Sequence, residues 1–203
     1  MLAHLGQVLP QAQLHGTDLH PLAIAHAAAR QAGTLTQSSA NALPYRDAAF
    51  DAVLAMDVYY VREVDDVRAL HEAHRVLKPG GLLLMNLPAF ELLRGEHDLA
   101  VHTRHRYTAP ELAQMLHAAG FSVLRLTYWN ALLFPLLLAR RQLRRPPAGA
   151  APRSDLTPLP AFINACFGAL LGVERFLLAH VNLPFGSSVF AVARKINPPR
   201  GIG

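Results

Sequence analysis

The densest group of ionisable side chains in the sequence lies between Gly95 and Tyr107. Two arginines in this segment, Arg104 and Arg106, could bind a phosphate or carboxylate, because a guanidinium presents several donors in a planar fork. Three side chains could take a proton from an attacking hydroxyl: His102, His105 and Tyr107. The segment is therefore either a substrate lid that carries an acid–base group, or a solvated loop before the next helix.

Two aspartates each stand near the end of a short apolar run. Asp18 lies near the end of Leu14–Leu19, and Asp57 lies near the end of Phe50–Val58. Runs of this kind predict buried strands, and ligands of parallel sheets bind at the carboxyl ends of the strands. Both carboxylates are thus candidates for ligand binding. The structural alternative for each is a helix cap, before Pro21 and before Val61 respectively.

The stretch Phe50–Pro88 predicts a strand, a helix, a turn and a second strand. From Val61 to Leu77 the apolar residues recur at helical spacing. Lys78-Pro79-Gly80-Gly81 ends this helix, because proline cannot continue it and glycine accepts a positive φ. A second strand begins at Leu82. A βαβ unit implies a parallel sheet with a right-handed crossover, so the pattern predicts an α/β fold.

The rest of the sequence continues the alternation. Further helices are expected at Met1–Leu9, Leu22–Ala32 and Pro110–Ala118, the last with Thr108 as N-cap, and further strands at Thr34–Ala40, Phe121–Trp129 and Ser187–Lys195.

Two blocks of this sequence closely resemble the class I S-adenosylmethionine (SAM)-dependent methyltransferases of the group called methyltransferase type 11. The blocks are LPYRDAAFDAV and HEAHRVLKPGGLLLM. In that family the first block leads into the fourth strand, and RVLKPGG joins a helix to the fifth. The matching separation of the blocks makes the resemblance specific, whereas KPGG alone only marks the end of a helix. The resemblance covers about residues 1–130 and the last strand, and it implies an α/β fold with a doubly wound, Rossmann-like, mostly parallel sheet.

The resemblance also implies SAM as the cofactor and assigns residues to it. Asp18 falls where an acidic side chain binds the two ribose hydroxyls, Ser39 and Ala40 fall near the adenine, and Asp57 faces the methionine end. The implied cofactor-binding set is Asp18, Leu19, Ser39, Ala40, Met56 and Asp57. Ser39 is a weaker partner than the acid that the family often carries near the adenine.

One part of the family pattern is missing from this sequence. Family members carry a first strand and a glycine-rich loop, D-x-G-C-G-x-G, before the helix that corresponds to Met1–Leu9. Two hypotheses follow. In the preferred one, Met1 lies inside a longer reading frame, because the helix starts without an N-cap residue. In the alternative, the chain is a truncated, catalytically inactive module that binds a membrane surface or a protein partner.

The sequence divides into a methyltransferase core, 1–130, a helical insertion, 131–186, and a last antiparallel strand with its tail, 187–203. The insertion carries two apolar segments, at Ala131–Ala139 and Phe162–Val181. Neither is expected to span a bilayer, since the first is shorter than about 20 residues and the second contains Glu174 and Arg175. The segments could lie on a bilayer or cover a hydrophobic substrate. The alternatives are an ordinary helical cover and a dimer interface.

Positive charge is concentrated in the C-terminal third. Residues 1–130 contain ten Lys/Arg and twelve Asp/Glu, whereas residues 131–203 contain nine and two. This distribution favours an anionic membrane surface or a phosphorylated substrate over nucleic acid. The single cysteine, Cys166, excludes an internal disulfide, and no metal-ligand spacing of cysteines occurs. The start is not that of a signal peptide. We expect a cytoplasmic protein, peripheral at the inner membrane face, that methylates a small, hydrophobic or lipid-linked acceptor.

Overall fold

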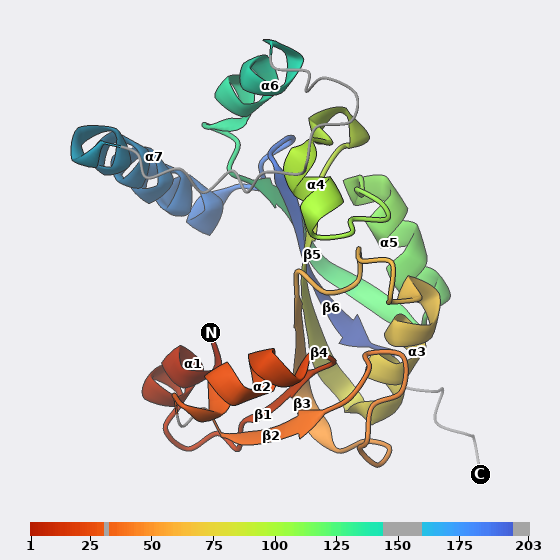
Figure 1. Cartoon of the computed structure of the whole chain (residues 1–203). Coiled ribbons are helices and arrows are strands. Elements are labelled where there is room, and N and C mark those ends of the chain that lie inside the picture. Colours follow the sequence, from red (N-terminus) through yellow and green to blue (C-terminus); the bar gives the residue numbers. More distant parts are fainter. Residues whose placement is uncertain (31–32, 144–159, 197–203) are drawn as a thin grey trace.

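The computed structural model describes residues 1–30, 33–143 and 160–196 (Figure 1). The helices are α1 (Leu2–Val8), α2 (Pro21–Ala28), α3 (Asp66–Val76), α4 (Glu96–Ala100), α5 (Ala109–Ala118), α6 (Phe134–Leu143) and α7 (Ala161–His180), with a short 3₁₀ turn η1 (Glu91–Leu93). The strands are β1 (His15–Asp18), β2 (Thr34–Gln37), β3 (Phe50–Met56), β4 (Leu77–Pro88), β5 (Phe121–Trp129) and β6 (Ser188–Lys195).

The strands form two sheets, one with two strands and one with four. β1 and β2 pair in parallel, and a four-stranded sheet has the order β3-β4-β6-β5. β3 and β4 are parallel, while β6 is antiparallel to both β4 and β5, so β5 points in the same direction as β3 and β4. Figure 1 shows α3, α4 and α5 on one side of the strands and α1, α2 and α7 on the other. The predicted fold class, including a late antiparallel strand, is confirmed.

The core lies on one face of the four-stranded sheet. Alternate side chains of β4 and β6 are almost fully buried there: Leu83, Met85 and Leu87 from β4, and Val189, Ala191 and Ala193 from β6. They belong to one apolar cluster with Leu70 of α3 and Leu112 of α5. The period of two along each strand places the intervening side chains on the opposite face, where they are only half-buried or line cavities.

Helix α3 starts later than the apolar spacing predicted. The predicted start was Val61, but the helix begins at Asp66, and Asp65 is its N-cap with a carboxylate that accepts from Arg68 N at 3.0 Å. Val64 is buried in the preceding loop. The spacing of valines was mistaken for helix because buried loop residues can share the helical interval, whereas the capping carboxylate fixes the true start. Helix α2 also ends earlier than predicted, at Ala28.

Arg75 ties together the two sequence blocks that carry the family resemblance. It lies in the second block, at the end of α3, and donates to the carbonyls of Leu43 and Tyr45 and to the carboxylate of Asp47 in the first block, at 2.7–3.0 Å. Glu72 holds the same guanidinium through two bonds of 2.8 Å. The separation of the two blocks is thus a structural requirement for docking the loop before β3 onto α3.

Replacing Arg75 by alanine should lower the free energy of unfolding by about 2 kcal/mol, because several charge-assisted hydrogen bonds are lost at a partly exposed site. Urea titration would measure the change. Arg68→Ala removes an exposed arginine from the same helix and should change stability by less than about 0.5 kcal/mol. Equal effects of the two variants would show that the loop is held by other contacts.

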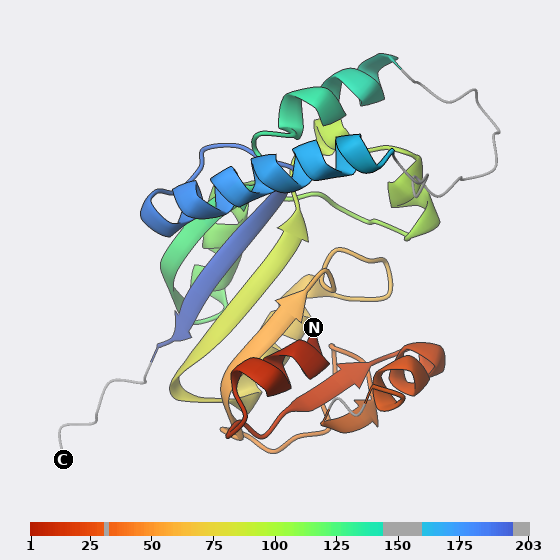
Figure 2. The ribbon, with the colours of Figure 1, turned by 90° about the vertical axis from the view of Figure 1, so that its left-hand side faces the viewer.

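β1 and β3 face each other across a cavity. Each pairs on one side only among the described strands, with β2 and β4 respectively. The cavity has a volume of about 440 Å³, and residues of both strands line it together with apolar side chains of α1 and α2. Figure 2 shows the two-stranded sheet beside the edge of the four-stranded one. The backbone edges of β1 and β3 that have no partner among the described strands therefore border this cavity.

Candidate active site

The predicted cofactor residues line one cavity. It has a volume of about 500 Å³ and lies at the carboxyl ends of β1, β2 and β3. Asp18, Leu19, Ser39, Ala40 and Asp57 all contribute to its wall. Met56 lies instead in the wall of an adjoining cavity, which it shares with Asp57. The volume falls within the range of small-molecule sites, and the position follows from the parallel strands, whose carboxyl ends meet at one edge.

Asp18 is available to a ligand and does not cap α2. Its Oδ1 accepts from the backbone N–H of His20 at 2.8 Å. The N-cap of α2 is His20, whose Nδ1 accepts from Leu22 N at 3.3 Å. A carboxylate has about four lone-pair sites, so one backbone bond leaves Asp18 able to accept from two adjacent hydroxyls.

The serines after β2 differ in their hydrogen bonding. Ser39 Oγ accepts from Asn41 N at 3.2 Å. Ser38, which lines the same cavity, has a buried hydroxyl oxygen without a partner in the described part of the chain. Because an unpaired buried hydroxyl is costly, a polar ligand in the cavity would stabilise this arrangement. The residues present thus fit a polar cofactor, and Ser38 is a candidate that sequence reasoning did not single out.

Asp57 lies where three cavities meet. It lines the cofactor cavity, the cavity of Met56 and a third, more polar one. Its backbone has a φ of 57°, which points the residue out of the strand direction at the end of β3. Its amide donates to Asn86 O at 3.0 Å, so the strand end is fixed to β4. Asp57 does not cap the following helix, because the N-cap of α3 is Asp65.

A short chain of side-chain hydrogen bonds orients Asp57. Trp129 Nε1 donates to Asn86 Oδ1 at 2.8 Å, and Asn86 Nδ2 donates to Asp57 Oδ1 at 2.9 Å. An indole N–H can only donate, so it fixes which end of the Asn86 amide faces the carboxylate. Burial raises the pKa of Asp57, and the hydrogen bond from Asn86 opposes this rise. Trp129 was expected only as the end of a strand, and only the pairing of β4, β6 and β5 reveals its role.

The second cavity is apolar and lies on the sheet face away from the core. Met56, Asn86, Phe190 and Thr127 stand in register across β3, β4, β6 and β5, so their side chains share one face. The cavity has a volume of about 470 Å³, and Leu178 of α7 completes its wall. Its lining combines apolar side chains with the polar end formed by Asp57, Asn86 and Trp129.

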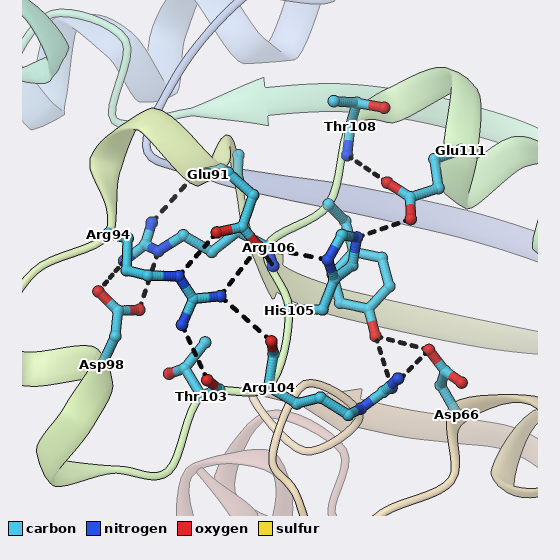
Figure 3. Close-up of polar contacts among 12 residues, drawn as sticks. Asp66, Glu91, Arg94, Asp98, Thr103, Arg104, His105, Arg106, Thr108 and Glu111 are labelled. Carbon is cyan, nitrogen blue, oxygen red and sulfur yellow. Dashed lines mark hydrogen bonds and ion pairs between the residues drawn. The ribbon is translucent and has the colours of Figure 1, made fainter.

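Arg106 and Asp98 form a buried ion pair in the third cavity (Figure 3). Arg106 Nε lies 2.8 Å from Asp98 Oδ1, and its Nη1 donates to Ala89 O at 3.0 Å. Arg141 of α6 adds a contact of 3.1 Å to the same carboxylate. Burial raises the pKa of Asp98, but the hydrogen bonds and charge of Arg106, the Gly95 amide and the charge of Arg141 together outweigh this effect and hold the pKa below its ordinary value. The pair fixes the segment after β4 to the domain.

The other candidates of this segment also make contacts within the chain. Arg104 pairs with Asp66 at 2.7 Å. Tyr107 is fully buried, and its hydroxyl lies 2.8 Å from Asp66 Oδ2, while burial raises its pKa. His105 lies between the carboxylates of Glu111, at 2.7 Å, and Glu91, at 3.2 Å (Figure 3).

Only two of the five predicted catalytic and substrate-binding residues line a cavity described above. His102 borders the cofactor cavity, and Arg106 borders the third cavity. The catalytic roles of His102, His105 and Tyr107 and the substrate contacts of Arg104 and Arg106 stay predictions. The geometry assigns a structural contribution to each arginine, because both are held by carboxylates of the chain.

Comparison with known proteins gives one family-model match. The family model described as a methyltransferase domain matches residues 1–85. The comparison with curated proteins gave no match.

Three solved structures share the fold. The SAM-dependent methyltransferase from Thermotoga maritima is 18% identical, with a TM-score of 0.55 over 96% of this chain and 77% of that one. Phosphoethanolamine N-methyltransferase 2 from Haemonchus contortus, in complex with S-adenosyl-L-methionine, is 16% identical, with a TM-score of 0.58 over 96% and 46%. Geranyl diphosphate methyltransferase, in complex with GPP and sinefungin, is 12% identical, with a TM-score of 0.62 over 96% and 68%.

The matched residues 1–85 include β1, β2 and β3, whose carboxyl ends border the cofactor cavity. The structural similarities extend the same fold over the rest of the chain. The chain shares the fold of the class I SAM-dependent methyltransferases, and its first 85 residues match the methyltransferase domain model.

Proposed function

We propose that this chain transfers the methyl group of SAM to an apolar or lipid-linked acceptor that binds beside Asp57. The observation that carries the proposal is that two cavities adjoin at Asp57. The cofactor cavity, with Asp18 and Ser39, and the apolar cavity, with Trp129 and Phe190, both include Asp57 in their walls. Donor and acceptor sites that adjoin at one side chain suit a reaction in which alignment supplies much of the rate.

The cofactor cavity offers separate contacts for the parts of SAM. Asp18 would accept from the ribose hydroxyls, and the Ser38–Ala40 segment would lie along the adenine. Asp57 would pair with the ammonium of the methionine part or orient the acceptor. SAM supplies a methyl group on a sulfonium centre. The other cofactor contacts would be made by backbone and apolar groups such as Leu19.

The apolar cavity supports the choice of acceptor class. Its wall includes the apolar side chains of Met56, Phe190 and Leu178 and the Trp129 ring, together with Asp57, Asn86, Arg125 and Thr127. A ligand with an apolar body and one nucleophilic atom would bury the body and present the atom to Asp57. Geranyl diphosphate methyltransferase, which shares the fold, was solved with an isoprenoid diphosphate, and this likeness gives a probe to test.

Asp57 is the residue best placed to hold a proton from the acceptor. Its pKa is raised by burial, which brings the carboxylate closer to the range of a useful base. Asn86 and Trp129 keep the carboxylate oriented toward the cavities. Alignment of the two ligands remains the main contribution expected from the protein.

Two assays test this function. Methyl-tritiated SAM, incubated with the protein and a total lipid extract, should transfer label into the organic phase. Geranyl diphosphate should change the fluorescence of Trp129, which is the only tryptophan and lines the apolar cavity. Failure to bind SAM, or no change of Trp129 fluorescence with geranyl diphosphate, would overturn the proposal.

Trp129→Phe should lower the rate of methyl transfer about threefold to tenfold while SAM affinity stays within about twofold, because one neutral hydrogen bond to Asn86 is lost. The freed amide would hold Asp57 less firmly, so the pKa of Asp57 should rise and the acid limb of the pH–rate profile should move to higher pH. Calorimetry and the tritium assay measure the two quantities. An unmoved acid limb would remove Trp129 from the positioning of Asp57.

A further inference from the structure

Helix α7 turns most of its apolar surface away from the domain and its only carboxylate, Glu174, toward it. The residues that turn toward the protein are Ile163, Phe167, Glu174 and Leu178, at helical spacing, and Glu174 is the most buried of them, with 2% exposure. The outward side is apolar. Phe162, Val173 and Phe176 are 77%, 54% and 68% exposed. Arg175 is the only formally charged side chain that the helix turns outward.

Specific contacts fix this orientation. Glu174 Oε2 accepts from Leu132 N at 3.1 Å, in the turn after β5. The guanidinium of Arg125, on β5, donates to the carbonyls of Leu178 and Val181 and to Asn182 Oδ1, the last at 3.0 Å. A cation at a helix C-terminus stabilises the last carbonyls and the helix dipole. The apolar side of α7 is therefore held away from the domain.

An apolar helix is stable when its surface is buried, either in a protein or in lipid. By length and composition the segment Phe162–His180 could cross a membrane, with a mean hydropathy of 1.5. Only 6% of this segment is buried against the domain. A spanning position would break the contacts of Glu174 and Arg125 with the domain. Figure 2 shows α7 lying lengthwise across one end of the sheet, a position that suits the plane of a bilayer surface.

We propose that α7 docks on an anionic lipid bilayer through this outward face, defined by Phe162, Leu170, Val173, Phe176 and Leu177. The charge of the surrounding sequence selects lipid over a second copy of the chain. Residues 131–203 carry nine Lys/Arg and two Asp/Glu, so two copies would repel through this region, whereas an anionic surface attracts it. The proposal is independent of the methyl transfer reaction.

The docking has a consequence for the apolar cavity. Leu178 of α7 forms part of that cavity's wall. A bilayer against the outer side of α7 would bring the cavity within the width of one helix of the lipid. An acceptor held in the membrane would then have a short path to Asp57.

The unique cysteine provides a direct probe. Cys166 lies on α7 and is exposed, so a polarity-sensitive fluorophore can be attached there without mutation. Addition of phosphatidylcholine vesicles that contain phosphatidylserine should shift the emission to the blue, and added salt should weaken the binding. Pure phosphatidylcholine vesicles should give a smaller shift. A label moved to α3, in Val67→Cys with Cys166→Ser, should give none.

Two charge-matched variants test the face itself by vesicle flotation. Val173→Asp should weaken binding to anionic vesicles at least tenfold, because an apolar contact becomes an anion. Val67→Asp alters a valine of the same exposure on α3, 55% against 54%, and should bind as the unmodified protein does. Near-ultraviolet circular dichroism shows that each variant is folded.

Three results would overturn the proposal. The first is no emission shift with either vesicle. The second is a shift without lipid that grows with protein concentration and is lost in Val173→Asp, which would make the occupant a second copy. The third is equal weakening of binding by Val67→Asp and Val173→Asp, which would place the contact elsewhere.

Discussion

Replacing Asp98 by alanine is expected to destabilise the fold by roughly 3–5 kcal/mol, which is the largest stability effect that we predict. The substitution would leave the guanidinium of Arg106 buried, 7% exposed, without its ion-pair partner. Breaking a buried pair from one side costs more than the pair itself contributes, because the remaining charge stays desolvated. Urea denaturation at neutral pH measures the loss.

The pH dependence of the same pair has a defined sign. The pKa of Asp98 is lower in the folded than in the unfolded state, so its contribution is present above the unfolded pKa and disappears as pH falls through the folded value. The stability difference between the unmodified protein and Asp98→Asn should therefore shrink in acid. Asp47→Ala serves as a control, since this exposed partner of Arg75 should cost less than about 1 kcal/mol. Equal costs for the two aspartates would contradict the structural importance of the buried pair.

Replacing Asp18 by alanine should weaken SAM binding about a hundredfold, with little change in stability. Two charge-assisted hydrogen bonds to the ribose hydroxyls would be lost, and together they can supply about 3 kcal/mol. Among the described residues, the Asp18 side chain accepts one exposed backbone hydrogen bond, from His20 N. Isothermal titration calorimetry measures the affinity and thermal unfolding measures the stability.

A matched control lies at the other end of β3. Asp51 is 85% exposed in its side chain and pairs with Lys78, far along the strand from the cofactor cavity. Asp51→Ala should leave SAM affinity unchanged within about twofold. If Asp18→Ala binds SAM as tightly as Asp51→Ala does, the ribose assignment is wrong.

The fold could be predicted from the sequence wherever a pattern is local. The alternation of apolar runs and turn signals gave the order of strands and helices, and Phe121–Trp129 has the predicted bounds. The prediction erred where a single contact decides a boundary. The start of α3 depends on the Asp65 carboxylate and the buried Val64, and neither is visible in the spacing of valines.

The site could be predicted in the part that the family resemblance covers. Asp18, Ser39 and Asp57 come from three strands that are far apart in sequence, yet they line one cavity. Trp129 could not be found in this way, because its contact with Asn86 spans β6, which arrives some sixty residues later in the chain. The ion pairs of the two arginines could not be predicted from charge density alone. Arg106 pairs with Asp98 in the same segment, and Arg104 pairs with Asp66 of α3, so which carboxylate each arginine contacts depends on the fold.

The central claim is that the cavity at the ends of β1, β2 and β3 binds SAM. The most direct test is calorimetric titration of SAM into the protein, with any residues encoded in frame before Met1 restored, and into its Asp18→Ala variant. The structure predicts saturable binding of one SAM per chain, weakened about a hundredfold in the variant. An absence of SAM binding to the protein would contradict the claim and favour a non-catalytic module with a methyltransferase fold.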